Sequence, residues 1–374
     1  MAGSGRTKRL LYSIYLGLGI APALFGGLEQ KVAAVSPAIN LTDQRKITNL
    51  PGHELYPQWS PDGQRIAFQD REGKIYLINK DGSGLKKIVN KETQSHGLVF
   101  SKPGFCWHPS GKKIIYAVDE LEGKSGIFEL DLKSGKEKLL VGGDGLDSPL
   151  YSPSGQHIAY LNGANWEDVS NIILYDTNTA KTRLLTNNSA RNIRKQDKVK
   201  GLGWFPDSKR IAFIEGPTYG TVTRGGNLYS ILKNGKARAP LGPKASLAGE
   251  EVYSFSISPD GKNILYQVWR GSENQTDGKY FTYTYDLQQN RKIILGESED
   301  AGDLGYQQWS PDGKMSSFTL DGELYTANKK GSKTRLTKTS YGELSPAFSP
   351  DGKSIAYSSN KDGDYDLYVG KVRL

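Results

Sequence analysis

Short runs of alternating hydrophobic and polar residues, separated by turn residues, fill most of the chain. In the first unit, residues 55–59 precede a Ser-Pro-Asp-Gly turn and residues 65–68 follow it with apolar side chains at alternate positions. Two further runs at 75–78 and 86–89 flank the segment Lys80-Asp-Gly-Ser-Gly84. Alternation bounded by Gly, Pro and Asp is typical of strands joined by tight turns. This unit therefore predicts four short β-strands.

The same unit recurs along the chain. Its Pro-containing turn appears seven times, with the proline at positions 61, 109, 153, 206, 259, 311 and 350. The spacings of 48, 44, 53, 53, 52 and 39 residues lie close to the periods of propellers and other repeat architectures. Four strands in each repeat are typical of a propeller blade. The repeat therefore predicts seven blades.

The two ends of the repeat region predict how the ring closes. The seventh unit has strand patterns at 354–357 and 366–369 but no fourth strand before Leu374. Residues 44–48, Gln-Arg-Lys-Ile-Thr, match the fourth strand of other units, such as 334–337. Pairing these segments would remove two exposed sheet edges. We therefore predict an all-β fold, a single seven-bladed β-propeller over 44–374 whose last blade is closed by an N-terminal strand.

The Trp-Ser-Pro-Asp-Gly turn, followed by Ile-Ala-Phe or Ile-Ala-Tyr and then Leu-Tyr, resembles the TolB-like PD40 repeat of the WD40-like propellers. It is also similar to the propellers of tricorn protease and the prolyl oligopeptidases. The resemblance covers about residues 44–374 and implies the fold. TolB proteins carry a separate α/β domain before a six-bladed propeller, and the sequence predicts neither feature here.

The N-terminal segment has the three parts of an export signal. Arg6-Thr-Lys-Arg9 precedes uncharged residues 10–28, and small residues end at Val32-Ala-Ala34. This plan predicts a signal peptide at 1–34 and a linker at 35–43. The alternative is an uncleaved anchor, because 19 uncharged residues approach the length of a membrane span. The protein is expected in the periplasm or outside the cell, or anchored to the inner membrane and facing outward.

Charge and cysteine content exclude several classes of function. The net charge is +9, and residues 1–34 contribute +3 of it, which leaves a modest +6 for the body. Nucleic-acid binding needs a concentrated basic surface, so no nucleic-acid partner is expected. Cys106 is the single cysteine, which excludes an intrachain disulfide and a Cys-based zinc site. Cys106 precedes Trp107 in a predicted innermost strand and is expected to be a small buried side chain.

Candidate chemistry in the sequence is sparse. No Gly-x-Ser-x-Gly motif occurs, and at most two of the histidines His53, His96, His108 and His157 are expected at one end of the ring. Residues 360–366, Asn-Lys-Asp-Gly-Asp-Tyr-Asp, resemble half of a calcium loop but lack its closing Glu. The same residues fit an ordinary Gly-containing hairpin. We therefore predict no catalytic residue, no metal site and no cofactor.

The connections between strands differ in length between the two ends of the predicted ring. Long segments at 90–104, 161–170, 186–201, 215–226, 269–280 and 295–305 are all expected at one end, where loops on a rigid scaffold commonly bind partners. Residues 186–201 carry a net +4 and residues 297–303 a net −4. The aromatic residues there are expected either to contact a partner or to pack at a loop base. The predicted partner-binding residues are Trp166, Arg191, Arg194, Lys195, Tyr219, Arg224, Trp269, Asp300 and Asp303.

These features lead to one principal hypothesis and one alternative. The first is an exported, non-enzymatic propeller that binds a protein or cell-envelope polymer, an oligosaccharide included, through its long-loop face. The alternative is a carbohydrate-active propeller enzyme, a polysaccharide lyase or glycoside hydrolase, with paired carboxylates near the channel.

Overall fold

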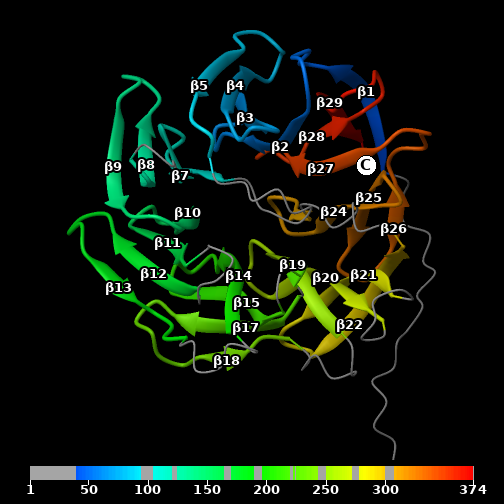
Figure 1. Cartoon of the computed structure of the whole chain (residues 1–374). Helices are drawn as coiled ribbons and strands as arrows, with labels where there is room; N and C mark the ends of the chain where they lie inside the picture. The colour runs from blue at the N-terminus through cyan, green and yellow to red at the C-terminus, as the bar shows by residue number, and fades with distance from the viewer. Residues whose placement is uncertain are drawn as a thin grey trace, which may run out of the picture.

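Seven antiparallel sheets stand around a common centre and follow one another in chain order, as Figure 1 shows. The computed structural model describes residues 39–93, 104–119, 124–163, 170–188, 196–219, 222–223, 225–242, 250–271, 278–299 and 307–373, with the backbone only at 196–197, 217–219 and 222–223. Each sheet is a blade whose first strand lies near the centre and whose fourth strand lies at the rim. The predicted all-β, seven-bladed fold is confirmed.

Blades 1 to 3 have four strands each. Blade 1 contains β2 (Glu54–Trp59), β3 (Arg65–Asp70), β4 (Ile75–Asn79) and β5 (Lys86–Val89). Blade 2 contains β6 (Phe105–Trp107), β7 (Lys113–Val118), β8 (Gly126–Asp131) and β9 (Glu137–Gly142). Blade 3 contains β10 (Asp147–Tyr151), β11 (His157–Asn162), β12 (Asn171–Asp176) and β13 (Thr182–Leu184).

Blades 4 and 5 have the longest inner strands of the ring, and blade 6 has the shortest. Blade 4 contains β14 (Gln196–Trp204), β15 (Arg210–Tyr219), the short β16 (Val222–Thr223), β17 (Asn227–Leu232) and β18 (Ala239–Pro240). Blade 5 contains β19 (Glu250–Ile257), β20 (Asn263–Arg270), β21 (Lys279–Asp286) and β22 (Arg291–Ser298). Blade 6 contains β23 (Gln308–Trp309), β24 (Met315–Leu320), β25 (Glu323–Asn328) and β26 (Lys333–Arg335).

Blade 7 joins the two ends of the chain. It consists of β27 (Glu343–Phe348), β28 (Ser354–Ser359), β29 (Asp366–Arg373) and the N-terminal strand β1 (Asn40–Lys46). β1 pairs antiparallel with β29, and Asn40 lies opposite Arg373. The predicted closure is therefore confirmed. The closing strand begins at Asn40, inside the segment that was expected to be a linker.

The core lies within and between the blades. The second strand of each blade is the most buried, as in β3, where Ile66, Ala67 and Phe68 are all fully buried. Six blades stack an aromatic ring of the second strand on one of the third, as Phe213 stacks on Tyr229 at 5.7 Å. The other pairs are Phe68–Tyr76, Tyr116–Phe128, Tyr266–Tyr283, Phe318–Tyr325 and Tyr357–Tyr368.

The recurring turn holds itself together and also contacts the next blade. In blade 1, Ser60 Oγ donates to Asp62 Oδ1 at 2.5 Å, and the same oxygen accepts from the Gln64 amide at 3.1 Å. Gly63 has a φ of +66°, and a Cβ there would lie 3.3 Å from Cδ of Pro350 in the turn of blade 7. Glycine is therefore needed both for its backbone conformation and for the close approach of the neighbouring turn.

Tryptophan links several neighbouring blades. The Trp59 indole N–H donates to the carbonyl of Ala347 in the preceding blade at 3.0 Å. Trp107, Trp204 and Trp309 make the same bond to Gln58, Leu150 and Ser256, at distances of 3.2–3.3 Å. Where the residue before the recurring turn is tryptophan, it therefore joins its blade to the preceding one. Cys106 lies beside Trp107 in the innermost strand β6, as expected, but it is half-buried rather than buried.

Candidate functional site

The connections between strands lie at two ends of the ring, which differ in character. We call the end with the first-to-second and third-to-fourth connections the turn end, and the opposite end the loop end. Two predicted loops at the loop end are partly strand, because β14 begins at Gln196 and β15 continues to Tyr219. The predicted loops 269–280 and 295–305 are likewise shortened by β20, β21 and β22. Blades 4 and 5 thus extend further at the loop end than sequence reasoning expected.

Most of the predicted partner-binding residues fall outside the described part of the chain. Tyr219 is the last residue of β15, and its backbone pairs with Val222. Trp269 is described in full and lies in β20. The positions outside the described residues are Trp166, Arg191, Arg194, Lys195, Arg224, Asp300 and Asp303. Their role in binding stays a prediction.

Trp269 is buried at the base of the β20–β21 connection. Its relative exposure is 6%. Gly271 and Gly278 lie against its indole so closely that neither leaves room for a Cβ. Of the two interpretations for this residue, packing at the loop base is the one that the geometry of Trp269 fits. Its two glycines explain the fit, because a side chain at either position would displace the ring.

Part of the predicted basic segment belongs to a strand. Lys198 in β14 has a relative exposure of 9%. The Lys200 ammonium donates to the carbonyl of Gly225 at 2.9 Å, and so ties β14 to the start of β17. These two lysines therefore contribute to the structure of blade 4 rather than to a solvated loop.

The predicted acidic segment begins with carboxylates that already have a cationic partner. Lys279 Nζ lies 3.4 Å from Glu297 Oε1 and 3.5 Å from Glu299 Oε1. Hydrogen bonding to Glu297 is the main reason that the pKa of Lys279 is raised. The three side chains are well exposed, so they form a polar surface with a net charge of −1 at the loop end of blade 5.

A pocket of about 290 Å³ opens between blades 4 and 5. Its apolar lining includes Leu228, Leu241, Val252 and Val268, and Tyr266 also borders it. Tyr266 has a relative exposure of 5%, and among the described residues its hydroxyl has no hydrogen-bond partner. Burial raises the pKa of this hydroxyl well above its usual value, so it remains a proton donor. The pocket can accommodate a small apolar group.

One buried carboxylate at this pocket is held by two cations. Glu250 Oε1 accepts from Arg270 Nε at 3.1 Å, and both of its carboxylate oxygens lie 3.3 Å from Lys292 Nζ. The carboxylate is only 7% exposed, so it depends on these partners for its charge to be tolerated. Glu250 also borders the pocket, which therefore has at one side a carboxylate that is paired with cations. Sequence reasoning missed this cluster, because its residues come from three strands.

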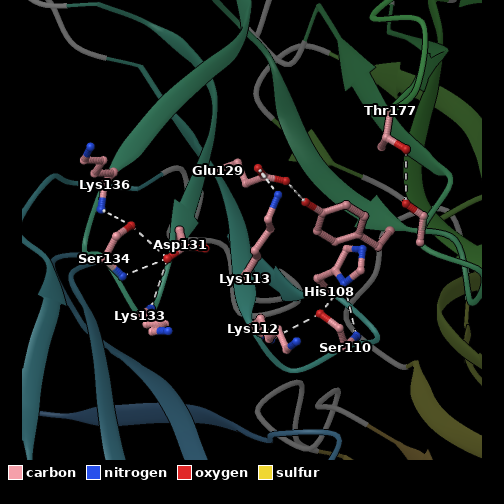
Figure 2. Close-up of polar contacts among 12 residues, drawn as sticks. His108, Ser110, Lys112, Lys113, Glu129, Asp131, Lys133, Ser134, Lys136 and Thr177 are labelled. Carbon is pink, nitrogen blue, oxygen red and sulfur yellow. Dashed lines mark hydrogen bonds and ion pairs between the residues drawn. The ribbon is translucent and has the colours of Figure 1, made fainter.

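Of the described histidines, His108 and His157 lie at the turn end and have structural partners. His108 Nδ1 lies 2.8 Å from Ser110 Oγ and accepts from the Ser110 amide at 3.1 Å, which repeats the capping role of serine and aspartate in other turns. Its ring packs edge-on against Tyr151, whose hydroxyl donates to Glu129 at 2.5 Å, as Figure 2 shows in part. Burial lowers the pKa of His108. His108 and Ser110 therefore cap the turn of blade 2.

The acidic segment at 360–366 connects β28 to β29, as the hairpin interpretation predicts. Lys46 Nζ lies 3.2 Å from Asp362 and 2.6 Å from Asp366, and Asp364 accepts from the Gly52 amide at 3.3 Å. Within the described residues no group of three or more His, Cys, Asp or Glu side chains could hold a metal ion. The same part of the chain contains no helix long and apolar enough to cross a membrane.

The fold and its turns define a β-propeller. The chain belongs to the PD40 family, the TolB beta propeller domain, whose family model matches residues 28–246. A second family, the dipeptidyl peptidase IV N-terminal region, matches residues 258–346. The resemblance seen in the recurring turn is thereby confirmed.

Curated relatives combine such propellers with different activities. Dipeptidyl-peptidase 5 of Porphyromonas gingivalis is 24% identical over 347 residues, covering 84% of this chain and 46% of that protein. The Tol-Pal system protein TolB of Francisella tularensis subsp. mediasiatica is 26% identical over 202 residues, covering 52% of this chain and 41% of that protein. The chain thus spans less than half the length of these relatives.

Solved structures show the same architecture. An oligogalacturonate lyase in complex with manganese superimposes with a TM-score of 0.66 at 15% identity, covering 91% of this chain and 99% of that one. Dipeptidyl peptidase 4 of Porphyromonas gingivalis gives a TM-score of 0.54 at 12% identity, covering 87% and 52% respectively. At these identities the likeness concerns the fold alone.

Proposed function

We propose that this chain is an exported, non-enzymatic scaffold that binds a protein or cell-envelope polymer at the loop end of blades 4 and 5. The observation that carries the proposal is that the strands of blades 4 and 5 are longer than those of blades 1 to 3. β14 and β15 have 9 and 10 residues and all four main strands of blade 5 have 8, whereas the described strands of blades 1 to 3 have 6 or fewer.

An extended edge on one side of a ring favours binding over a purely architectural role. Rigid strands position the side chains at their ends more precisely than free loops do. The blade 4–5 pocket and the polar surface around Lys279 lie on this extension, and the predicted residues Arg191, Arg194 and Asp300 are close to it in sequence. Apolar space beside charged groups is typical of a protein or oligosaccharide site.

An exported location is the second part of the proposal. It is supported by the signal-like sequence at 1–34, which lies outside the described residues, and by the relationship to TolB proteins. If the segment is retained, the ring faces outward from the inner membrane.

Photocrosslinking in intact cells tests the binding site. A photoreactive residue at Lys279 or Glu299 at the loop end is expected to give adducts with a partner, because both side chains are exposed there. The matched control places the photoreactive amino acid at Lys262 or Lys314, at the turn end. It is expected to give no adduct with this partner. Replacing Arg191, Arg194 and Lys195 with Glu should abolish capture. Equal adducts from both ends, or unchanged capture by the triple variant, would contradict the site.

The non-enzymatic part of the proposal has its own test. Purified chain is incubated with acidic and neutral oligosaccharides, and its metal content is measured in parallel. Turnover of any of them would replace the scaffold with the carbohydrate-active alternative. No turnover together with intact loop-end crosslinking is the expected result.

A further inference from the structure

The turn end has a regular construction that the proposed partner site does not use. All seven connections between the first and second strands contain five residues, as at 60–64 and 108–112. Neighbouring turns touch: a Cβ on Gly111 would lie 3.4 Å from Pro61, and one on Gly313 would lie 3.4 Å from Pro259. Equal lengths and side-by-side contacts place the tips of these turns at one level around the ring.

Lysine occupies the same place in most of these turns. The fifth residue follows the turn glycine, or Ser208 in blade 4, and it is exposed in every case where it is lysine. Blades 1 and 3 have Gln64 and Gln156 instead. The ring lysines are Lys112, Lys209, Lys262, Lys314 and Lys353. Five ammonium groups therefore surround the centre of the turn end.

The third-to-fourth connections add positive charge outside this ring. The thirteen described connections at the turn end contain thirteen lysines, six aspartates and Arg238. Arg238 pairs with Glu215 within blade 4 and is left out of the balance. The lysines and aspartates give +7, whereas residues 35–374 carry +6 in total, so the remainder of the ring has a net charge of −1. The positive charge of the body is thus concentrated at the turn end.

The aspartates at this end are hydrogen-bonded within the turns, and Asp260 also pairs with Lys329 at 2.6 Å, whereas the five ring lysines are exposed. Asp260 Oδ1 accepts from Ser258 Oγ at 2.6 Å and from the Lys262 amide at 3.0 Å, and Asp351 does the same with Ser349 and Lys353. Among the ring lysines, only Lys314 has an ion pair within the described residues, a 3.4 Å contact with Asp312 that is itself highly exposed. Figure 2 shows Lys112, Lys133 and Lys136 at the turns of blade 2.

We propose that the turn end docks on the surface of a bilayer that contains anionic lipid. A planar anionic surface can meet all the lysines of a level ring at once, whereas a linear polymer reaches only those along one line. Compact, hydrated ammonium groups suit non-specific attraction to headgroups. All five cations at the fifth position of these turns are lysines. Charge complementarity therefore favours a bilayer as the occupant.

The path of the chain supports the same orientation. Asn40 pairs with Arg373 at the turn-end limit of β29, so the chain enters the ring at the lysine-bearing end. The uncharged residues 10–28 and the basic residues Arg6–Arg9 precede this point in sequence. A ring docked in this way directs its loop end, and any partner bound there, away from the membrane. The docking surface is separate from the proposed partner site.

Vesicle flotation of the full chain tests the proposal. Vesicles of phosphatidylcholine are compared with vesicles that also contain about 30 mol% phosphatidylglycerol, and the readout is the ratio of the two partition coefficients. Any binding of residues 10–28 to uncharged lipid is common to both vesicle types, so it does not change which of the two vesicles is preferred. Each lysine near an anionic surface contributes roughly fivefold, so at least a tenfold preference for anionic vesicles is expected. It should disappear at about 1 M salt, where charges are screened within about 3 Å.

Two variants with the same change in net charge locate the surface. The turn-end variant replaces Lys112, Lys209, Lys262, Lys314 and Lys353 with Gln, and it should lose at least tenfold of the anionic preference. The loop-end control replaces Lys91, Lys124, Lys279, Lys338 and Lys361 with Gln, and it should stay within about threefold of the unaltered chain. Circular dichroism verifies that both variants remain folded.

Three outcomes would overturn the proposal. They are an absence of anionic preference in the unaltered chain, an equal loss in both variants, and binding to soluble polygalacturonate or polyglutamate with none to anionic vesicles. The last result would assign the turn end to a polymer. None of them affects the loop-end crosslinking test, so the failure of one proposal is distinguishable from the failure of the other.

Discussion

The glycine of the recurring turn meets two separate requirements, and single substitutions can separate them. Gly155 and Gly135 have nearly the same φ, +72° and +68°. A Cβ on Gly155 would lie 2.6 Å from Nε2 of His108, whereas nothing lies within 4 Å of a Cβ on Gly135. His108 cannot easily move aside, because Ser110 and Tyr151 hold its ring. Alanine at either position therefore has a similar backbone cost, and only alanine at position 155 also meets a neighbouring side chain.

We predict that Gly135→Ala lowers the free energy of unfolding by about 1 kcal/mol, the usual cost of a left-handed alanine. Gly155→Ala should cost at least about 1 kcal/mol more, because it adds a steric conflict to the same backbone penalty. Urea unfolding of both variants measures the difference. Adding His108→Ala to Gly155→Ala should recover part of the extra loss, and equal costs for the two single variants would contradict this account.

At the residue scale, the sequence predicts those features that depend only on residues adjacent in the chain. The turns at 60–64 and 349–353 were predictable, because Pro, Asp and Gly act on their own backbone. The Glu250–Arg270–Lys292 cluster could not be predicted, because its members come from β19, β20 and β22. Their alignment also depends on a bulge between Val252 and Ser254 that leaves no signal in the sequence. Pairing across strands is the information that the sequence alone lacks.

At the scale of the elements, the first strand of each blade carries the contacts to its neighbour. Trp309 in β23 is 7% exposed, and its indole N–H donates to the carbonyl of Ser256 in β19 at 3.2 Å. Phe348 occupies the equivalent place in blade 7, which shows that a phenyl ring fits this position of the repeat. The bond can therefore be removed without removing an aromatic ring.

We predict that Trp309→Phe lowers the free energy of unfolding by about 1–3 kcal/mol. The change removes one hydrogen bond and part of a buried ring, and it leaves the Ser256 carbonyl without that donor. Thermal and urea denaturation measure the effect, and near-ultraviolet circular dichroism checks that the blades remain packed. A loss below about 0.3 kcal/mol would show that the indole does not join blades 5 and 6.

Strand lengths mark the limit of sequence prediction at this scale. The strand patterns at 65–68 and 75–78 correspond to β3 and β4, because burial on both faces selects apolar residues there. The sequence predicts a loop where β14 begins, because Lys198, Lys200 and Gly201 lack the expected alternation. Lys198 is buried all the same, and a register shift between Val199 and Gly201 accommodates the pattern.

At the scale of the whole molecule, the seam that closes the ring contains a buried acid. Glu54 in β2 is 1% exposed. Its carboxylate accepts from Thr48 Oγ1 at 2.7 Å and from the Leu50 amide at 2.8 Å, both in the segment that follows the closing strand. Burial raises the pKa of Glu54 to about 7, and nearby Asp366 in β29 adds to the rise. Glu343, at the seam between blades 6 and 7, has a pKa raised to about 7 for the same main reason.

We predict that Glu54 makes the ring less stable as the pH rises from 5 to 8. The folded state binds this proton more tightly than the unfolded state, whose pKa is near 4.5. The stability from Glu54 is therefore present at low pH and is lost through pH 7, at about 1.4 kcal/mol or less for each pH unit. Unfolding of the native chain and of Glu54→Gln, measured across this range, gives a difference curve that should fall for the native chain.

The control for this prediction should be flat. Hydrogen bonding to Lys74 lowers the pKa of the exposed Glu72 from a value that already lies below this pH range, so the difference between the native chain and Glu72→Gln should stay constant from pH 5 to 8. The lowered pKa values of His108 and His157 favour folding at higher pH, and they cancel in a difference curve. A flat Glu54→Gln difference curve would place the pH dependence of the ring elsewhere.

The pairing of Asn40 with Arg373 also bears on how the chain could be rewired. Because β1 and β29 are already neighbouring antiparallel strands, a short turn between them would turn the closing seam into an ordinary hairpin of the kind found in the other six blades. New termini could then be opened between any two blades. Such circular permutants should keep the same ring, because each blade depends on its neighbours in space and not on where synthesis begins.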